Sequence, residues 1–299
     1  MIKEFALDPT LLLHWAKSAR DYHEFLREYG RGTPRLISSF PKKKFSKLRS
    51  YLIEKSDCLE NETAKLRYVE MVQALAEGLV CRSSEVSSTS DWYDLVQVEN
   101  QLNPFDTILS SKKINIDSAI SLEDMYDSTL WNLPSQLNIK RTQEEFLNNL
   151  DSFVKTTTEH LVFIDAFCYQ NRAIDIIAKL VNKLEQRKSK ELIPKVLVFY
   201  RSNQNSRNVH FVKEKILEKI NPELEIDLKV SELQPLAGQD AFHNRYLLND
   251  CGGVLLPYGF DLSDEDCETD EAIILSKENY NKRWGQFVEN LSFNLVNQA

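Results

Sequence analysis

The spacing of apolar residues changes between the two halves of the chain. In the first half, apolar residues recur every three or four positions, which is the period of a helix that buries one face. Asp8 supplies a helix cap, and the pattern that follows it predicts one long helix ending before Gly30. Further helices are predicted near residues 61–79 and 142–156. The first half is therefore expected to be mainly helical.

The second half alternates short apolar runs with helical patterns. Residues 161–165 form a continuous apolar run, a helical pattern covers residues 171–187, and a second apolar run occupies residues 195–200. A strand, a helix and a strand in that order indicate a parallel pair joined by a crossover helix. The alternation continues to a last helix near Trp284. This half is therefore expected to form a sandwich with helices on both faces of a sheet.

Together the two patterns predict an α/β protein with two domains. A length of 299 residues is long for one compact core, which favours the same division. We place a mainly helical binding or docking domain at residues 1–154 and an α/β sandwich at residues 155–299. Loops at the carboxyl ends of such strands hold ligands, so Asp165, Tyr200 and Arg201 are expected beside any site.

The bulk composition is that of an ordinary globular protein, with 42% hydrophobic and 27% charged residues. No apolar run approaches the roughly 20 residues that a membrane span needs, and the N-terminus lacks a signal-peptide core. We therefore expect a cytoplasmic protein without a membrane span. The five cysteines are scattered, which argues against a disulfide framework and a structural zinc site.

The net charge of −8 does not indicate a nucleic-acid-binding protein, but the charge is unevenly distributed. One stretch carries seven basic residues and no acidic residue; these are Arg31, Arg35, Lys42, Lys43, Lys44, Lys47 and Arg49. Such a patch can contact nucleic-acid phosphates even on an acidic protein. A solvated loop and helix start, or a patch on a membrane surface, would have the same composition. The sequence leaves these interpretations open.

An acidic stretch lies near the C-terminus. Residues 261–271 carry seven carboxylates and no basic residue. The stretch lacks the glycine and the ligand spacing of a calcium-binding loop. We expect an acidic loop that contacts a partner or acts as a gate.

A short segment before this loop combines a histidine, a cation and a carboxylate in His243, Arg245 and Asp250. If the segment is a strand, His243 and Arg245 point to the same side, because side chains alternate. A proton carrier beside a fixed positive charge suits attack on a phosphate. The alternative is an ordinary strand histidine with a surface arginine.

The pattern His243-x-Arg245-x-x-x-x-Asp250 resembles the histidine-lysine-aspartate signature of the phospholipase D superfamily, with Arg245 at the lysine position. The order of strands and helices over residues 155–299 is similar to one half of that fold. The resemblance implies that His243 attacks phosphorus and forms a phosphohistidine, while a second histidine protonates the leaving oxygen. It implies that Arg245 holds the non-bridging oxygens and that Asp250 orients or charge-balances the histidine pair. No metal ion or other cofactor is implied.

Three departures from the family pattern shape this hypothesis. The family uses two motifs, whereas no other histidine here is followed two residues later by a cation, so a working site requires a homodimer. Arg245 keeps the charge of lysine but presents a planar fork. Pro257 and Tyr258 replace the glycine and serine that normally follow the motif, and Tyr258 could donate to a phosphate.

The sequence thus favours a metal-independent phosphodiesterase. A nuclease fits better than a lipase, since the basic stretch offers a surface for a nucleic-acid backbone. The combination with a helical half resembles proteins encoded in bacterial anti-phage loci. The alternative is a catalytically inactive phospholipase D-like subunit that mediates assembly with other protein subunits or binds nucleic acid.

Overall fold

The computed structural model describes residues 1–83, 91–236, 242, 244–263 and 267–299. Over these residues the chain is an α/β protein with two compact units. The N-terminal unit comprises residues 2–134 and 188–190, and the C-terminal unit comprises Met1 and residues 135–187 and 191–299.

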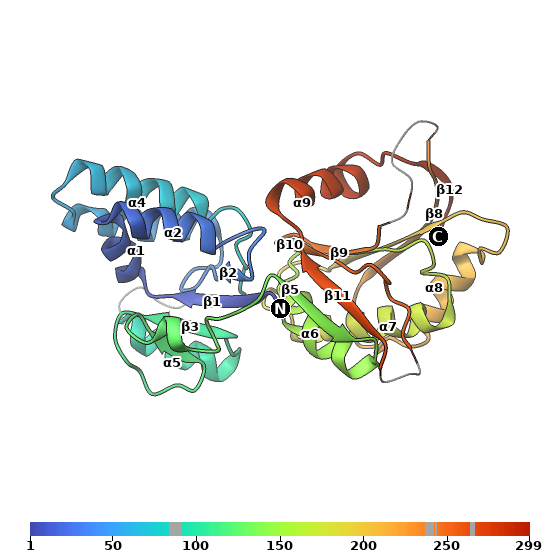
Figure 1. The fold of residues 1–299 in the computed structure, drawn as a ribbon, viewed down its shortest axis with the longest axis horizontal. Coiled ribbons are helices and arrows are strands. Elements are labelled where there is room, and N and C mark those ends of the chain that lie inside the picture. Colours follow the sequence, from blue (N-terminus) through green and yellow to red (C-terminus); the bar gives the residue numbers. More distant parts are fainter. Residues whose placement is uncertain (84–90, 237–241, 243, 264–266) are drawn as a thin grey trace. The chain divides into compact units, whose positions relative to one another are not determined.

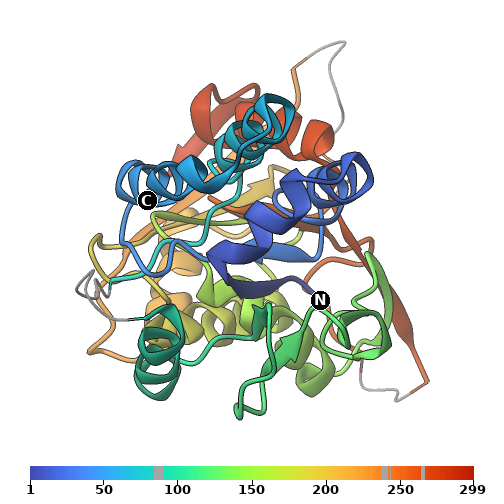
Figure 2. The same ribbon diagram turned by 90° about the vertical axis from the view of Figure 1, so that its left-hand side faces the viewer.

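The N-terminal unit is built on a parallel sheet of four strands in the order β2-β1-β3-β4. The strands are β1 (Lys3–Leu7), β2 (Arg35–Ile37), β3 (Thr107–Ser110) and β4 (Ala119–Ser121). The helices are α1 (Pro9–Ala16), α2 (Ala19–Glu28), α3 (Phe45–Ile53), α4 (Glu62–Ala74) and α5 (Trp92–Leu102), with short turns η1 (Glu54–Cys58) and η2 (Met125–Asp127). Figures 1 and 2 show α1, α2 and α4 together on one side of this sheet and α5 on the other.

Two features of this unit differ from the sequence prediction. The predicted first helix is divided, because the Ser18 hydroxyl accepts the Asp21 N–H and caps α2. The sheet was not predicted, because its strands are short and β1 carries a buried Glu4 that breaks the apolar pattern. The unit therefore combines the expected helices with a four-stranded sheet that was not expected.

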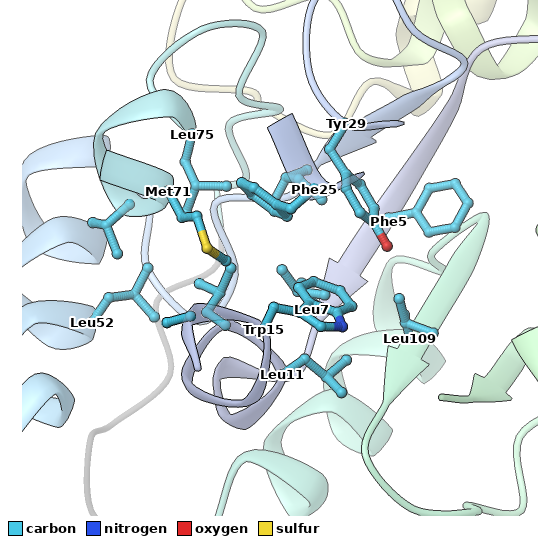
Figure 3. Packing of buried hydrophobic residues seen from close by; sticks show 14 of the residues in the cluster. Phe5, Leu7, Leu11, Trp15, Phe25, Tyr29, Leu52, Met71, Leu75 and Leu109 are labelled. Atoms are coloured by element: carbon cyan, nitrogen blue, oxygen red, sulfur yellow. The ribbon is translucent and has the colours of Figure 1, made fainter. Parts of the chain in front are cut away.

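The core of the N-terminal unit lies between the helices and the sheet. Trp15 of α1 packs against Phe25 of α2 with ring centroids 5.8 Å apart, and Tyr29 stands 5.1 Å from Phe25. Met71 of α4 and Leu109 of β3 are fully buried in the same cluster (Figure 3). These apolar contacts hold the helices on the sheet.

A buried ion pair ties this unit together on the other side of the sheet. The guanidinium of Arg82 donates twice to the carboxylate of Glu4, at 2.8 Å each, and once to Glu99. Its remaining N–H groups donate to the backbone oxygens of Asn103 and Pro104. All five donors of Arg82 are thus used, and its side chain is 0% exposed.

The C-terminal unit is built on a mixed sheet in the order β12-β8-β7-β6-β9-β10-β11-β5. The strands are β5 (Gln136–Lys140), β6 (His160–Ile164), β7 (Lys195–Arg201), β8 (Asp227–Gln234), β9 (Tyr246–Asn249), β10 (Gly252–Leu255), β11 (Thr269–Ile274) and β12 (Asn294–Gln298). The helices are α6 (Gln143–Lys155), α7 (Asn171–Asn182), α8 (Val209–Leu217) and α9 (Lys277–Trp284), with short turns η3 (Lys183–Gln186) and η4 (Gly285–Glu289). Figure 1 shows α9 on one face and α6, α7 and α8 on the other.

The compact units divide after Pro134, earlier in the chain than the predicted boundary after residue 154. The reason is that β5 pairs with β11 at the edge of the C-terminal sheet. The helix α6, which the sequence analysis assigned to the first domain, buries Phe146 and Leu150 in the C-terminal unit.

Candidate functional site

Three chain segments meet at one end of the central strands of the C-terminal sheet. Strands β6 and β7 are parallel, and β9 is antiparallel to β6 with Tyr246 opposite Ile164. The carboxyl ends of β6 and β7 therefore lie beside the amino end of β9. This geometry brings Asp165, Arg201 and Arg245 to the same end of the sheet.

A pocket of about 530 Å³ opens at this end of the sheet. Its described lining residues are Ala166, Phe167, Tyr169, Arg201, Ser202, Asn203, Gln204, Asn205, Phe242 and Arg245. The lining contains two cations, two hydroxyls, three side-chain amides and three aromatic rings, one of which carries one of the hydroxyls. Such a wall suits an anionic ligand that also carries an apolar or aromatic part.

Asp165 lies behind the pocket wall and is almost fully buried. Its Oδ1 accepts the Phe167 N–H at 2.8 Å, and its Oδ2 accepts the Phe260 N–H at 3.1 Å. Burial raises the pKa of Asp165, and the positive charge of Arg245 and the two backbone donors only partly offset this effect. Asp165 is thus a carboxyl group whose charge is costly and depends on Arg245.

Arg245 connects this buried carboxyl to the pocket. Its Nε lies 3.3 Å from Asp165 Oδ1, and its Nη1 donates to the Pro257 backbone oxygen at 3.2 Å. The guanidinium carbon lies 5.4 Å from the centroid of the Phe167 ring. The Arg245 side chain is 19% exposed. Part of this cation is therefore accessible from the pocket.

Gly259 closes the loop over the Asp165–Arg245 pair. Its φ is +70°, in the left-handed region that favours glycine. A Cβ atom at this position would lie 1.9 Å from Asp165 Oδ2 and 2.5 Å from Arg245 Cδ. Only glycine allows the backbone to approach the ion pair this closely.

His243, the predicted nucleophile, lies outside the described residues. Two described residues close to it in the sequence, Phe242 and Arg245, line the pocket. Phe242 is buried and packs against Phe287 and Phe293, with ring centroids 5.8 and 5.5 Å away.

Asp250 does not lie with Asp165 and Arg245 at the pocket. It follows the carboxyl end of β9, whereas Arg245 precedes the amino end, and a strand rises about 3.3 Å per residue. Its carboxylate accepts the backbone N–H groups of Thr158, Glu159 and His160 and contacts His160 Nδ1 at 3.2 Å. Burial would raise the pKa of Asp250, but these bonds outweigh it and lower the pKa. Asp250 therefore fixes the start of β6.

The predicted basic stretch is only partly a surface. Arg35 is buried, pairs with Glu28 at 2.9 Å and lies 3.9 Å from the centroid of the Trp131 ring, so the fold itself uses this cation. Three members are exposed at the start of α3: Lys44, Lys47 and Arg49. The three others are half-buried: Arg31, Lys42 and Lys43. All seven belong to the N-terminal unit.

Tyr258 precedes Gly259 in the loop over the ion pair. Its side chain is exposed, its backbone N–H donates to Asp270 at 3.1 Å, and Arg141 lies 4.7 Å from its ring centroid. The described part of the pocket lining does not include Tyr258. The ring contacts a cation of the fold rather than the pocket.

Two kinds of feature are absent from the residues that the structure describes. No group of three or more histidine, cysteine or acidic residues is arranged to hold a metal ion. None of the helices in the described ranges has both the length and the apolar character that a membrane crossing requires.

The sequence predicted part of this site. Asp165 and Arg201 were expected at the carboxyl ends of their strands, and both lie there, whereas Tyr200 is buried and donates to the Arg207 backbone oxygen. Phe167 and the polar loop 202–205 were not predicted from the sequence. Their position directly after two apolar strands is the signal that could have identified them.

Comparison with known proteins gives weak likenesses. No protein-family model and no curated protein matches the chain. Among solved structures, NucT from Helicobacter pylori has a TM-score of 0.37 and 16% sequence identity, over 54% of this chain and 98% of its own. The archaeal chromatin protein TrmBL2, whose structure shows a novel mode of DNA binding, has a TM-score of 0.27 and 12% identity, over 68% of this chain. Polyphosphate kinase from Porphyromonas gingivalis has a TM-score of 0.33 and 11% identity, over 75% of this chain.

The matched regions make up different fractions of the known chains. The matches span 61% of the TrmBL2 chain and 36% of the polyphosphate kinase chain. All three TM-scores are below 0.5, so none of them assigns an activity to this chain.

Proposed function

We propose that the C-terminal unit is a metal-independent phosphodiesterase that acts on nucleic acid. The observation that supports this most is the pocket lined by Arg201 and Arg245. Two guanidinium groups can hold the non-bridging oxygens of a phosphodiester, since arginine binds two oxygens of one phosphate at once.

The reaction follows from the resemblance to the phospholipase D superfamily. An imidazole nitrogen of His243 forms a bond to phosphorus while the bond to the leaving oxygen breaks, and that oxygen takes a proton from a second histidine. Water then attacks the phosphohistidine, gives a proton to the second histidine and releases His243. Arg245 stabilises the charge on the phosphate oxygens in both steps.

The second histidine comes from a second copy of the chain in this proposal. None of the described pocket residues is a histidine. His160 contacts Asp250 at the opposite end of β6, and His210 lies on the first turn of α8. A two-fold axis would place two copies of His243 at one phosphate without a second motif in the chain.

The exposed cations at the start of α3 supply a further contact in this proposal. Lys44, Lys47 and Arg49 can neutralise phosphates along a nucleic-acid backbone, which adds affinity without sequence preference. A role in bacterial anti-phage defence would fit a nuclease with such a surface. It rests on the resemblance of the two-part chain to proteins of anti-phage loci.

Hydrolysis of bis-p-nitrophenyl phosphate in EDTA tests the proposed reaction. We expect turnover by the wild-type protein and a loss of at least 1,000-fold in His243→Asn, because the covalent step requires the imidazole. His210→Asn, at an exposed position on α8, is the control and should keep its activity. Full activity in His243→Asn would remove the proposal.

Mixing subunits tests the shared site. If each site needs two copies of His243, activity in mixtures with His243→Asn after subunit exchange should fall with the square of the wild-type fraction. A linear decrease would show that one chain suffices.

A binding or assembly subunit is the second candidate. The ion pair between Arg245 and Asp165 favours it, since this cation is partly neutralised before any ligand arrives. It predicts oligonucleotide binding, or stable association with other protein subunits, without EDTA-resistant cleavage. Turnover that depends on His243 would exclude it.

A further inference from the structure

The aromatic ring of Phe167 lies at the pocket beside Arg245, the cation that is proposed to bind phosphate. Phe167 is 38% exposed, although Ala166 and Cys168 on either side of it are buried. The ring packs edge-on against Tyr169 at 6.2 Å, and the Arg245 guanidinium carbon lies 5.4 Å from its centroid. A large apolar group kept partly in water at a pocket is a feature of ligand sites.

The facing wall of the pocket is polar and partly fixed. The Asn203 side chain donates to the Tyr169 hydroxyl at 3.2 Å and accepts the Asn205 N–H at 2.8 Å. The side chains of Gln204 and Asn205 are exposed in the same loop. Side-chain amides carry both donors and acceptors, which match the edges of nucleobases. The acyl chains of a lipid would find no matching groups on this wall.

The size of the pocket sets a further condition. A volume of about 530 Å³ suits a ligand as large as one nucleotide. A base inside a duplex is stacked and paired, so it reaches such a pocket only after leaving the helix, whereas an unpaired base enters without that cost.

We propose that the pocket binds one unpaired nucleobase on the Phe167 ring, with the adjoining phosphate at Arg245. The ligand class is therefore single-stranded nucleic acid. This inference rests on the proposed phosphodiester site and adds its substrate class. Phe167 is a specificity-determining residue in this arrangement, since stacking gives affinity for bases without reading their sequence.

Fluorescence anisotropy with the full-length His243→Asn protein tests the inference. The probes are a 12-nucleotide single strand, the same strand in a duplex, the same strand with abasic sites, and anionic phospholipid vesicles. We expect the single strand to bind at least 10-fold more tightly than the duplex and the abasic strand. Tighter binding to the duplex or to the vesicles would overturn the inference.

Variants then separate stacking from general charge. Phe167→Ala should weaken single-strand binding by about 10- to 100-fold, as expected for the loss of one stacked base, and Phe167→Trp should restore it. Phe211 provides a matched control, because it is 37% exposed in the same unit and has Arg207 5.1 Å from its ring centroid. Phe211→Ala should change affinity less than twofold. Equal losses in the two alanine variants would contradict a base-binding role of Phe167.

The outcomes distinguish this inference from the proposed function. Turnover of bis-p-nitrophenyl phosphate by the wild-type protein, together with equal binding of normal and abasic strands, would remove the base site and keep the phosphodiesterase. Phe167-dependent binding of single strands without any turnover would remove the phosphodiesterase and keep the base site.

Discussion

Among the residues that the structure describes, two arginines pair with buried carboxylates, one in each unit, and the fold uses them differently. Arg82 is fully enclosed, and each of its five N–H groups has an oxygen partner, including both carboxylate oxygens of Glu4. Arg245 faces one buried carboxyl, Asp165, and lines a pocket with its side chain 19% exposed. The structure uses every N–H donor of Arg82, whereas the guanidinium of Arg245 is partly accessible to a ligand.

The pKa values of the two carboxyl groups, Glu4 and Asp165, are shifted in opposite directions. Burial would raise the pKa of Glu4, but the charge and hydrogen bonds of Arg82 outweigh it, so the net shift is downward. For Asp165 burial prevails over Arg245 and the pKa is raised. A saturated pair therefore stabilises its own charges, while the pocket pair leaves a cation that an incoming phosphate can recruit.

Removing Arg82 should have the largest effect on stability. Arg82→Met leaves Glu99 buried without its cation and Glu4 with only Lys188, 3.6 Å away, and breaking a buried pair typically costs about 3–5 kcal/mol. Urea unfolding monitored by circular dichroism measures the loss. Arg49→Met, at an exposed position, should stay within about 0.5 kcal/mol of the wild type. A small effect of Arg82→Met would show that the two pairs are not as different as proposed.

The next largest effect on stability is expected when one carbon is added at Gly259, beside the Asp165–Arg245 pair. Gly259→Ala places a Cβ against Asp165 and requires a left-handed backbone from alanine, for a cost of about 1–3 kcal/mol. Gly252→Ala is the matched control, because its nearest contact would be 4.0 Å away. Unfolding curves of the two variants that coincide would contradict the close packing of this loop on the ion pair.

Asp250 tests the opposite end of β9. Its folded pKa is lowered, so its stabilisation is present above the ordinary pKa of 3.8 and is lost as pH falls through the lowered folded value. Asp250→Asn should cost about 2 kcal/mol at pH 7, through weakened hydrogen bonds to a charged group, and the cost should shrink as pH falls below 3.8 towards the folded pKa. Asp227→Asn, at an exposed position, serves as the control. A penalty independent of pH would be inconsistent with this role.

Removing Arg245 should have the smallest effect on stability. Asp165 keeps its two backbone donors in Arg245→Met and can take up a proton, so the cost at pH 7 is about 1 kcal/mol. Because the folded pKa of Asp165 lies above its ordinary value, ionisation is penalised as pH rises, and the variant should regain stability relative to wild type as pH falls. Stability curves measured between pH 4 and 8 provide the check. A cost as large as that of Arg82→Met would give Arg245 a structural role.

The sequence predicted the elements that one pattern determines and missed those that depend on distant partners. Strands β6 and β7 are continuous apolar runs, so their positions and the site at their carboxyl ends could be predicted. Strand β1 could not, because its buried Glu4 is tolerated through distant cations, above all Arg82. Arg35 was expected at the surface, but Glu28 and Trp131 enclose it.

The candidate site shows the same limit. Arg245 was identified from a motif, yet Asp165 became its partner only through the pairing of β6 with β9. Asp250 belongs to the same motif but lies at the other end of the strand, where it binds the start of β6. A motif thus gives residue types and spacing, while the strand register decides which of them meet.

Salt dependence of oligonucleotide binding tests the central claim most directly. With the His243→Asn protein and a short single strand, the affinity is measured between 50 and 300 mM salt, with and without Arg245→Met. If Arg245 binds a phosphate, its loss should weaken binding at low salt and make the slope of log K against log salt shallower by about 0.7. Identical affinities and slopes in the two proteins would contradict the claim that Arg245 serves a ligand.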